Sequence, residues 1–305
     1  MERKVFVAVV LTLILVLLFV SGQQGCKKEE KTTFNTTALI VKFIDDAPPV
    51  QLVPGEKYRI YAEVKNLGGY DVNPGNAHFF LSGIGENLKN VNLHLQNSNL
   101  LNKKTTMQEG GKEQIIFTNN AEVSEKLSSL PAPFNFNMRL DSCYKYATIT
   151  QTEVCVGRGD NICSIAGEKI VSGSNSAAPL QVTSLKESVQ GNKLYVTFLI
   201  ENKGNGEVYL PNADCVKIQE QNIDEKLKQN KVELAIEAEE GFSCKLQSTQ
   251  PPYGTIDSLN GIASIGTITC QKTLTETTGH KIPFRIVLSY VYRESITKGL
   301  TILPP

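Results

Sequence analysis

The sequence predicts an all-β protein built from two tandem antiparallel β-sandwiches. Three observations support this prediction. Apolar and polar side chains alternate over many short stretches, as half-buried strands require because successive side chains point to opposite faces. Turn-rich pieces containing Gly, Pro and Asn separate these stretches. The two halves of the 305-residue chain also resemble each other, and the length suits two domains.

The alternating stretches recur throughout the chain after residue 30, where helical periodicity is scarce. One polar stretch, residues 220–231, breaks the pattern and suits a short helix within a solvated insertion. The expected strands centre on residues 58–64, 91–95, 134–146, 194–200 and 284–292.

The internal repeat is visible at both ends of each half. Residues 63–72 (EVKNLGGYDV) match residues 199–208 (LIENKGNGEV), since in each a strand ends in Asn and a Gly-rich corner follows. Residues 134–150 (FNFNMRLDSCYKYATIT) resemble residues 283–297 (PFRIVLSYVYRESIT), with Tyr-x-Tyr and Ile-Thr in matching places. Matched starts and ends predict two homologous domains.

These matches set the expected domain borders. We expect the first sandwich at residues 38–157 and the second at residues 178–303. Residues 158–177 are small and polar, which is the composition of a linker between folding units.

The N-terminus predicts export. An unbroken apolar run of sixteen residues, 5–20, follows Arg3 and Lys4 and precedes small and polar residues. This layout is typical of a secretory signal, and the run is slightly short for a spanning helix. We expect residues 1–25 to be a signal peptide or membrane anchor, so that everything after them is extracytoplasmic.

Gly25-Cys26 resembles the lipobox of prokaryotic lipoproteins, in which a small residue precedes a cysteine that is lipidated. Gln23 and Gln24 depart from that pattern. Three arrangements stay open: a lipoprotein modified at Cys26, an uncleaved signal anchor, and plain secretion. Residues 26–37 would form a flexible tether, and Asn35 begins an N-glycosylation sequon within it.

The six remaining cysteines predict three disulfides, because an even number in an exported chain suggests cross-links. A hairpin turn near residues 149–151 would place Cys143 opposite Cys155. Two strand-like runs of the second domain would bring Cys244 to Cys270, which leaves Cys163 for Cys215. Six cysteines allow 15 connectivities, so this set is one hypothesis among them.

The sequence contains no recognisable catalytic motif. Lys+Arg and Asp+Glu number 31 each, and this balance argues against nucleic-acid binding. The histidines His78, His94 and His280 are scattered outside hydrolase and zinc motifs. The acidic clusters at residues 45–46 and 237–240 lack the spacing of a calcium loop. We therefore expect no catalytic residue, no metal and no cofactor.

The strand–Asn-x-Gly–strand corners at residues 66–68 and 202–204 are similar to those of immunoglobulin-like modules in prokaryotic surface proteins. The chain resembles the cell-adhesion-related and fibronectin type III-like domains of archaea and bacteria over most of residues 38–303. This resemblance implies two immunoglobulin-like sandwiches and a role at the cell surface. It implies no particular functional residues.

The resulting hypothesis is a non-enzymatic, membrane-tethered surface protein for adhesion, envelope assembly or protein binding. Residues 73–80 (NPGNAHFF) and the insertion at residues 217–240 are the most distinctive candidate binding segments. An accessory subunit of a secretion, pilus or transport machine is the alternative. An envelope hydrolase is a third reading, and it requires a pocket that gathers polar groups.

Overall fold

Strands dominate the computed structural model, which describes residues 33–127, 129–157, 163–250, 254–275 and 278–305. The predicted signal or anchor, 1–25, and Cys26 lie outside the described residues. The predicted all-β class is confirmed. The strands are β1 (Leu39–Phe43), β2 (Gln51–Leu52), β3 (Lys57–Asn66), β4 (Ala77–Ser82), β5 (Leu88–Lys89), β6 (His94–Gln96), β7 (Lys112–Val123), β8 (Phe134–Val156), β9 (Leu180–Gln190), β10 (Lys193–Asn202), β11 (Glu207–Tyr209), β12 (Lys231–Glu237), β13 (Phe242–Gln247), β14 (Thr255–Ser258), β15 (Asn260–Ser264), β16 (Gly266–Thr273) and β17 (His280–Ile302), and the helices are α2 (Cys215–Gln219) and α3 (Ile223–Lys226).

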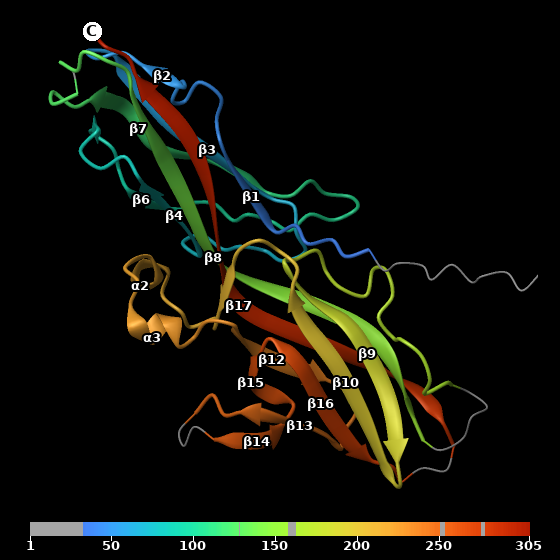
Figure 1. Ribbon diagram of the computed structural model, residues 1–305. Helices are drawn as coiled ribbons and strands as arrows, with labels where there is room; N and C mark the ends of the chain where they lie inside the picture. The colour runs from blue at the N-terminus through green and yellow to red at the C-terminus, as the bar shows by residue number, and fades with distance from the viewer. Residues whose placement is uncertain (1–32, 128, 158–162, 251–253, 276–277) are drawn as a thin grey trace, which may run out of the picture. The chain divides into compact units, whose positions relative to one another are not determined.

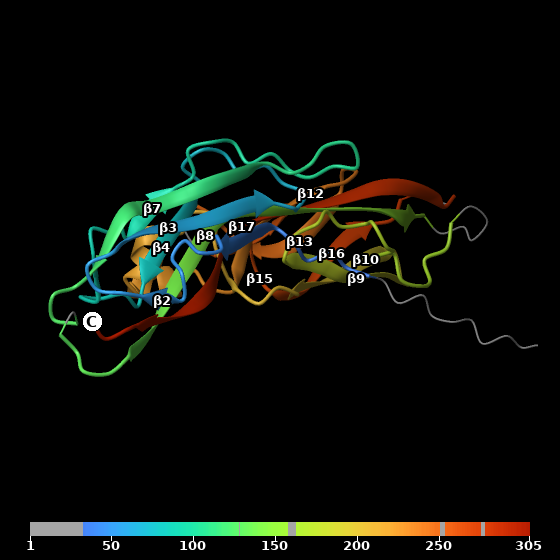
Figure 2. The same ribbon diagram turned by 90° about the horizontal axis from the view of Figure 1, so that it is seen from above.

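The strands form two sheets. The smaller sheet has the order β1-β3-β7-β5 and is antiparallel. The larger follows the path β6-β4-β8-β17-β12-β15-β13-β16-β10-β9, with β2, β11 and β14 attached beside it. Strands β3 and β7 lie over β4 and β8 (Figure 1, Figure 2), and their inward side chains join one apolar core. Each inward face follows from the alternating sequence pattern, as in the burial of every second residue of β3.

β8 and β17 are the longest strands of the larger sheet. Each has 23 residues, and the two pair antiparallel along their whole length, from Phe134 opposite Ile302 to Val156 opposite His280. Figure 1 shows them running side by side between the strands of the two repeats. The larger sheet therefore continues from one sequence repeat into the other without a break.

The register of this ladder relates the two repeats by an approximate two-fold axis. Tyr144 lies opposite Tyr292, and Tyr146 lies opposite Tyr290. In the sequence repeat, Tyr144 is equivalent to Tyr290 and Tyr146 to Tyr292. A rotation that exchanges β8 and β17 therefore places the pair Tyr144–Tyr292 on the pair Tyr290–Tyr146. All four rings are buried and in contact, with centroids 5.8 Å apart for the first pair and 6.4 Å for the second. The axis passes through the residue pair between them.

Both long strands reach beyond their own repeat. The first half of β8 pairs with β4, whereas its second half pairs with the beginning of β17. β17 pairs with β12 near its start and with β2, of the first repeat, at its end. The expected borders at 157 and 178 stay a prediction, and residues 34–305 form a single compact unit.

The described part of the expected linker is packed against this ladder. The backbone amide of Gln151 donates to the carbonyl of Ser174 at 2.8 Å, and that of Ser176 donates to Ile149 at 2.8 Å. Residues 34–37 are held as well, since the carbonyl of Asn35 accepts the amide of Ala178 at 3.0 Å.

The corner after β3 is closed by one asparagine and one tyrosine. Asn66 Oδ1 accepts the backbone N–H of Gly68 at 3.0 Å, and Asn66 Nδ2 donates to the carbonyl of Tyr70 at 2.7 Å. The hydroxyl of Tyr146 on β8 accepts the backbone N–H of Tyr70 at 3.3 Å. The buried Asn66 amide thereby satisfies backbone groups that would otherwise lie unpaired in the core.

The corner after β10 repeats these contacts. Asn202 Oδ1 accepts the N–H of Gly204 at 3.1 Å, and its Nδ2 donates to the carbonyl of Gly206 at 2.8 Å. The hydroxyl of Tyr292 on β17 accepts the N–H of Gly206 at 2.7 Å. Matching contacts at matching positions give the sequence repeat a structural counterpart.

Glycine is required at both corners because a tyrosine hydroxyl occupies the place of its side chain. A Cβ at Gly68 would lie 1.9 Å from the oxygen of Tyr146, and a Cβ at Gly204 would lie 2.2 Å from that of Tyr292. This explains why the sequence keeps Asn-x-Gly at both places.

We expect Asn66→Ala to lower the free energy of unfolding by about 2 kcal/mol, because it removes three hydrogen bonds at a buried corner: from the Gly68 amide, to the Tyr70 carbonyl and to the Leu101 carbonyl, which keeps the Val72 amide as its other donor. Urea denaturation followed by circular dichroism measures this loss. Asn202→Ala is the matched control, with an expected loss of about 1 kcal/mol because Asn202 is only half-buried. A larger loss for Asn202→Ala would contradict the comparison.

Candidate functional site

The disulfides agree with the sequence hypothesis at one of three positions. Cys244 is joined to Cys270, the pair expected from the two strand-like runs, and these residues lie directly opposite each other on β13 and β16. The expected pairs Cys143–Cys155 and Cys163–Cys215 are not formed. Instead, Cys143 is joined to Cys215 and Cys155 to Cys163.

The length of β8 explains both corrections. The expected turn at residues 149–151 does not exist, because β8 runs on to Val156. Cys143 and Cys155 therefore lie about 40 Å apart along one strand, at roughly 3.3 Å per residue. Cys143 does point away from the main core, as its position in the alternation predicted, and Cys215 of α2 meets it there.

The Cys143–Cys215 disulfide lies where the two candidate binding segments meet, one from each repeat. Cys143 on β8 is opposite His78 of the first segment, and Cys215 comes two residues before the second. A second, small apolar cluster forms around it, and Phe80 of the first segment contacts this cluster together with Ile218 of the second. The full cluster consists of Phe80, Cys143, Tyr209, Ala213, Cys215, Ile218 and Val291. We call the surface made by β4, β6, α2 and α3 the composite face.

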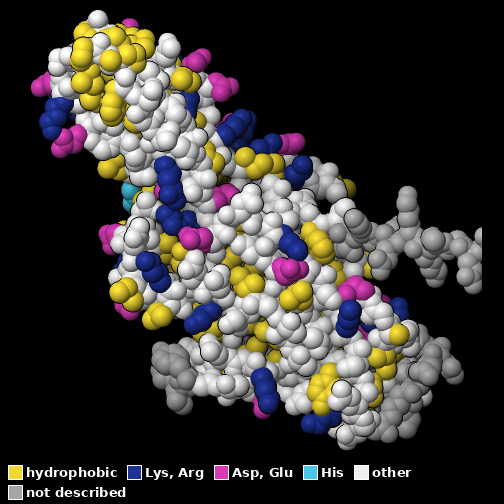
Figure 3. Space-filling model, viewed as in Figure 1, with side chains coloured by type: hydrophobic (Ala, Val, Ile, Leu, Met, Phe, Trp, Pro, Cys, Tyr) yellow, Lys and Arg dark blue, Asp and Glu magenta, His cyan; other side chains and the backbone are white. Residues whose placement is uncertain are grey.

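The helical part of the composite face exposes apolar side chains. Asp214 caps α2 by accepting the amides of Val216 and Lys217, and Asn222 caps α3. Ile223 is 74% exposed and Leu227, one turn later, is 66% exposed. Figure 3 shows hydrophobic side chains at the surface over α3. Capped ends and the disulfide fix these helices, which are too short to be stable alone.

A charged network underlies the helices. Asp141 is buried, and its Oδ1 accepts hydrogen bonds from Arg139 at 2.6 Å and from Arg293 at 3.2 Å. Arg293 also donates to Gln219 of α2 at 3.0 Å and to Glu207 at 3.2 Å. A cavity of about 220 Å³ opens between Arg293, β11 and α3. The network ties the insertion to the centre of the β8–β17 ladder.

His78 and His94 lie on the sheet side of the composite face. Both come from neighbouring strands, β4 and β6, at the edge of the larger sheet. His78 Nδ1 lies 3.1 Å from His94 Nε2, and Phe80 stacks on the His94 ring at 4.3 Å between centroids. Figure 3 shows histidine at the surface close to the helices. The spacing of the histidines in the sequence did not indicate that these two lie together.

Burial lowers the pKa of His78, and the neighbouring charges of His94 and Lys145 lower it further, while Asp214 raises it. Burial also lowers the pKa of His94. Both imidazoles are therefore neutral at pH 7.

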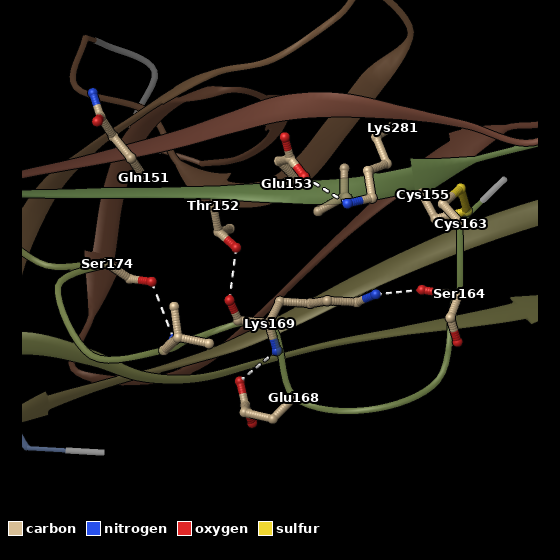
Figure 4. Close-up of a pocket in the computed structure, with 12 residues that line it drawn as sticks. Gln151, Thr152, Glu153, Cys155, Cys163, Ser164, Glu168, Lys169, Ser174 and Lys281 are labelled. Atoms are coloured by element: carbon tan, nitrogen blue, oxygen red, sulfur yellow. Dashed lines mark hydrogen bonds and ion pairs between the residues drawn. A yellow bond between two sulfur atoms is a disulfide. The ribbon is translucent and has the colours of Figure 1, made fainter. Parts of the chain in front are cut away.

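A second candidate site is the cavity of about 340 Å³ shown in Figure 4, between β8 and residues 163–174. The Cys155–Cys163 disulfide closes one end. Thr152 donates its hydroxyl to the carbonyl of Lys169 at 2.7 Å, and the Lys169 ammonium contacts the carbonyl of Ser164. The first contact joins β8 to residues 163–174 and the second lies within those residues, so together they hold the segment in place.

Two carboxylates next to this cavity also hold residues 163–174 in place. Glu187 is buried, accepts the N–H of Cys155 at 3.0 Å and pairs with Lys169 at 3.5 Å; burial nevertheless raises its pKa. Burial also acts to raise the pKa of Glu168, but hydrogen bonds from Leu185, Ser184 and its own segment lower it below the ordinary value. Glu168 thereby covers part of the free edge of β9, which protects that edge from pairing with another chain.

The remaining predicted residues are dispersed. His280 lies 3.6 Å from Glu239, which also pairs with Lys272, and Glu237 pairs with Arg285. Asn35 is exposed, and its Oδ1 accepts the N–H of Thr37 at 3.2 Å. A further cavity of about 690 Å³ lies over Ile282 and Phe284, beside the Arg285–Glu237 pair.

In the part of the chain that the structure describes, no group of three or more His, Cys, Asp or Glu side chains is arranged to hold a metal ion. Among the same residues, no helix has the length and hydropathy needed to cross a bilayer.

Comparison with protein-family models gives no match, and comparison with curated proteins gives none either. Three disulfides indicate an oxidising, extracytoplasmic environment. The composite face is the surface on which both repeats and a disulfide converge.

Proposed function

We propose that this chain is a non-enzymatic, membrane-tethered protein of the cell surface whose two immunoglobulin-like sandwiches bind a protein or envelope partner. The observation that carries the proposal is the Cys143–Cys215 disulfide, which holds the start of the second distinctive segment against β8, beside the first. Loops held by a rigid scaffold are the usual place for binding residues. Here the scaffold is the ladder of β8 and β17, and the composite face is built directly on it.

The N-terminal sequence supports the tether in this proposal. A basic start, an apolar run and Gly25-Cys26 suit a lipidated or anchored exported protein. The disulfides agree with export, because they persist in oxidising compartments. In this view the tether places the composite face outside the cytoplasm, where it meets its partner.

A second candidate function is an accessory subunit of an envelope machine. The exposed pair Ile223 and Leu227 favours it, because a fixed partner could cover two neighbouring apolar side chains on a rigid helix. In this case the composite face docks permanently on one membrane protein, whereas an adhesive role leaves it free between encounters.

Site-specific photo-crosslinking in whole cells tests the proposal. A photoreactive residue at position 227 should capture a partner, whereas the same residue at Met107, which is 98% exposed and far along the chain, should capture much less. One stoichiometric membrane partner would favour the accessory subunit, and several surface partners would favour adhesion. Equal capture at both positions, or a protein recovered in the cytosol, would contradict the proposed function.

A further inference from the structure

The paired histidines on the composite face are placed by the register of the sheet. In the ladder of β4 and β6, His78 lies opposite Gln96, and Phe80 lies opposite His94. Opposite residues of an antiparallel pair point to the same face, and so do residues two apart on one strand. All four side chains therefore project from one face at the sheet edge. His78 and His94 are diagonal neighbours on it.

The two imidazoles meet nitrogen to nitrogen. Their planes lie within 12° of each other, with centroids 5.3 Å apart and His78 Nδ1 3.1 Å from His94 Nε2. This is the arrangement of a coplanar N–H···N hydrogen bond. It is also close to the separation of two adjacent ligands on a tetrahedral ion, about 3.3 Å for metal–nitrogen bonds of about 2.0–2.1 Å.

We propose that His78 and His94, assisted by the side-chain oxygen of Gln96, form a binding site for a borderline divalent transition-metal ion such as Cu²⁺, Ni²⁺ or Zn²⁺. A modest rotation of both rings turns the two facing nitrogens outward onto one ion. The proton now between the rings moves to the other nitrogen of its own imidazole. Both rings stay neutral, two metal–nitrogen bonds form, and no proton is released.

Neighbouring groups prepare both rings. His78 also hydrogen-bonds the backbone of Gly75, which is the kind of outer contact that orients a metal-binding imidazole. His94 is held by Phe80, whose other side is buried in the small cluster around the disulfide.

The remaining ligands are fewer than in a structural zinc site. The Gln96 amide lies 3.4 Å from His78 Nδ1, and turning it about its last torsion presents the oxygen in place of the nitrogen. The negative charge of Asp214 favours a cation here, and the positive charge of Lys145 opposes it. Water or a donor from another molecule would fill the open positions. Imidazole and amide ligands with open positions select Cu²⁺ most strongly among these ions.

Isothermal titration of the full, oxidised chain with Ni²⁺ or Zn²⁺ tests the site. The sequence has three histidines, so His280→Gln is a matched control that removes an imidazole elsewhere. We expect one equivalent to bind in the micromolar range, since the site has about half the protein ligands of a structural zinc site. His78→Gln and His94→Gln should each weaken binding by at least about tenfold. His280→Gln should leave it unchanged.

The spectrum of bound Cu²⁺ provides a second readout. Electron paramagnetic resonance should show two imidazole nitrogens bound to Cu²⁺ in the unmodified chain and one in His94→Gln. His94 is exposed on the edge strand β6, so we expect this variant to fold. Binding that survives both single replacements, or that is lost in His280→Gln, would overturn the proposal. The same holds if no one-to-one complex forms. The site is measured with metal alone, so this result is independent of the proposed function.

Discussion

Replacing Cys143 and Cys215 together by serine should lower the free energy of unfolding by about 4 kcal/mol. The disulfide closes a loop of 72 residues, and a cross-link of that length restricts the unfolded chain strongly. It also fastens α2 and α3, which have little stability of their own. Guanidinium denaturation of the oxidised double variant and of the unmodified chain measures the difference.

The matched control is the double replacement of Cys155 and Cys163. That disulfide closes a loop of 8 residues, so the same reasoning predicts a loss of about 2.5 kcal/mol. Crosslinking from position 227 adds a functional readout, because only loss of the Cys143–Cys215 bond should release the composite face. A greater loss of stability in the control pair would show that loop length does not govern these disulfides.

Glu294→Gln should stabilise the protein by up to about 3 kcal/mol at pH 8 and have little effect at pH 4. Glu294 faces the core beside Tyr144 and Tyr292 on the ladder, and burial raises its pKa from 4.5 to about 7. Between these two values the folded chain holds a proton that the unfolded chain has lost. Stability is therefore full below pH 4.5 and falls as the pH rises through 7.

Urea denaturation at a series of pH values tests this prediction. The unmodified chain should lose stability from pH 4.5 to pH 7 by the amount that Glu294→Gln avoids. Glu153→Gln is the control, because Glu153 is exposed and pairs with Lys281 at 3.0 Å, a contact of little energetic weight. Parallel pH profiles for Glu294→Gln and the unmodified chain would contradict the assignment.

The sequence predicted the all-β class and the equivalence of the two corners because both depend on local patterns. Alternation identified the inward face of β3 and β10 residue by residue. The matched Tyr-x-Tyr positions identified the tyrosines that close the corners. The alternation also indicated that Glu294 is unusual, because this charged residue is next in the series of buried positions from Phe284 to Tyr292.

The continuity of β8 was missed, although the sequence carried a signal for it. Residues 134–156 contain neither Gly nor Pro, so nothing in them ends a strand. Assuming an ordinary strand length introduced a hairpin and led to the wrong partner for Cys143. The mean length of strands is a weak guide where two strands support each other over their whole length.

The composite face could not be derived from the sequence. The contact of His78 with His94 depends on the register of β4 against β6, which alternation alone does not fix. The contact of Phe80 with Cys215 depends on an insertion folding back across the ladder. Both are long-range consequences of the shared strands.

The most direct test of this account is non-reducing peptide mapping of the protein from cells whose thiols are blocked at harvest. An exported chain with the shared ladder should yield three linked peptide pairs, Cys143–Cys215, Cys155–Cys163 and Cys244–Cys270, and no blocked thiol among these six residues. Six blocked thiols would contradict export, and a Cys143–Cys155 peptide would contradict the continuous β8 strand on which the composite face depends.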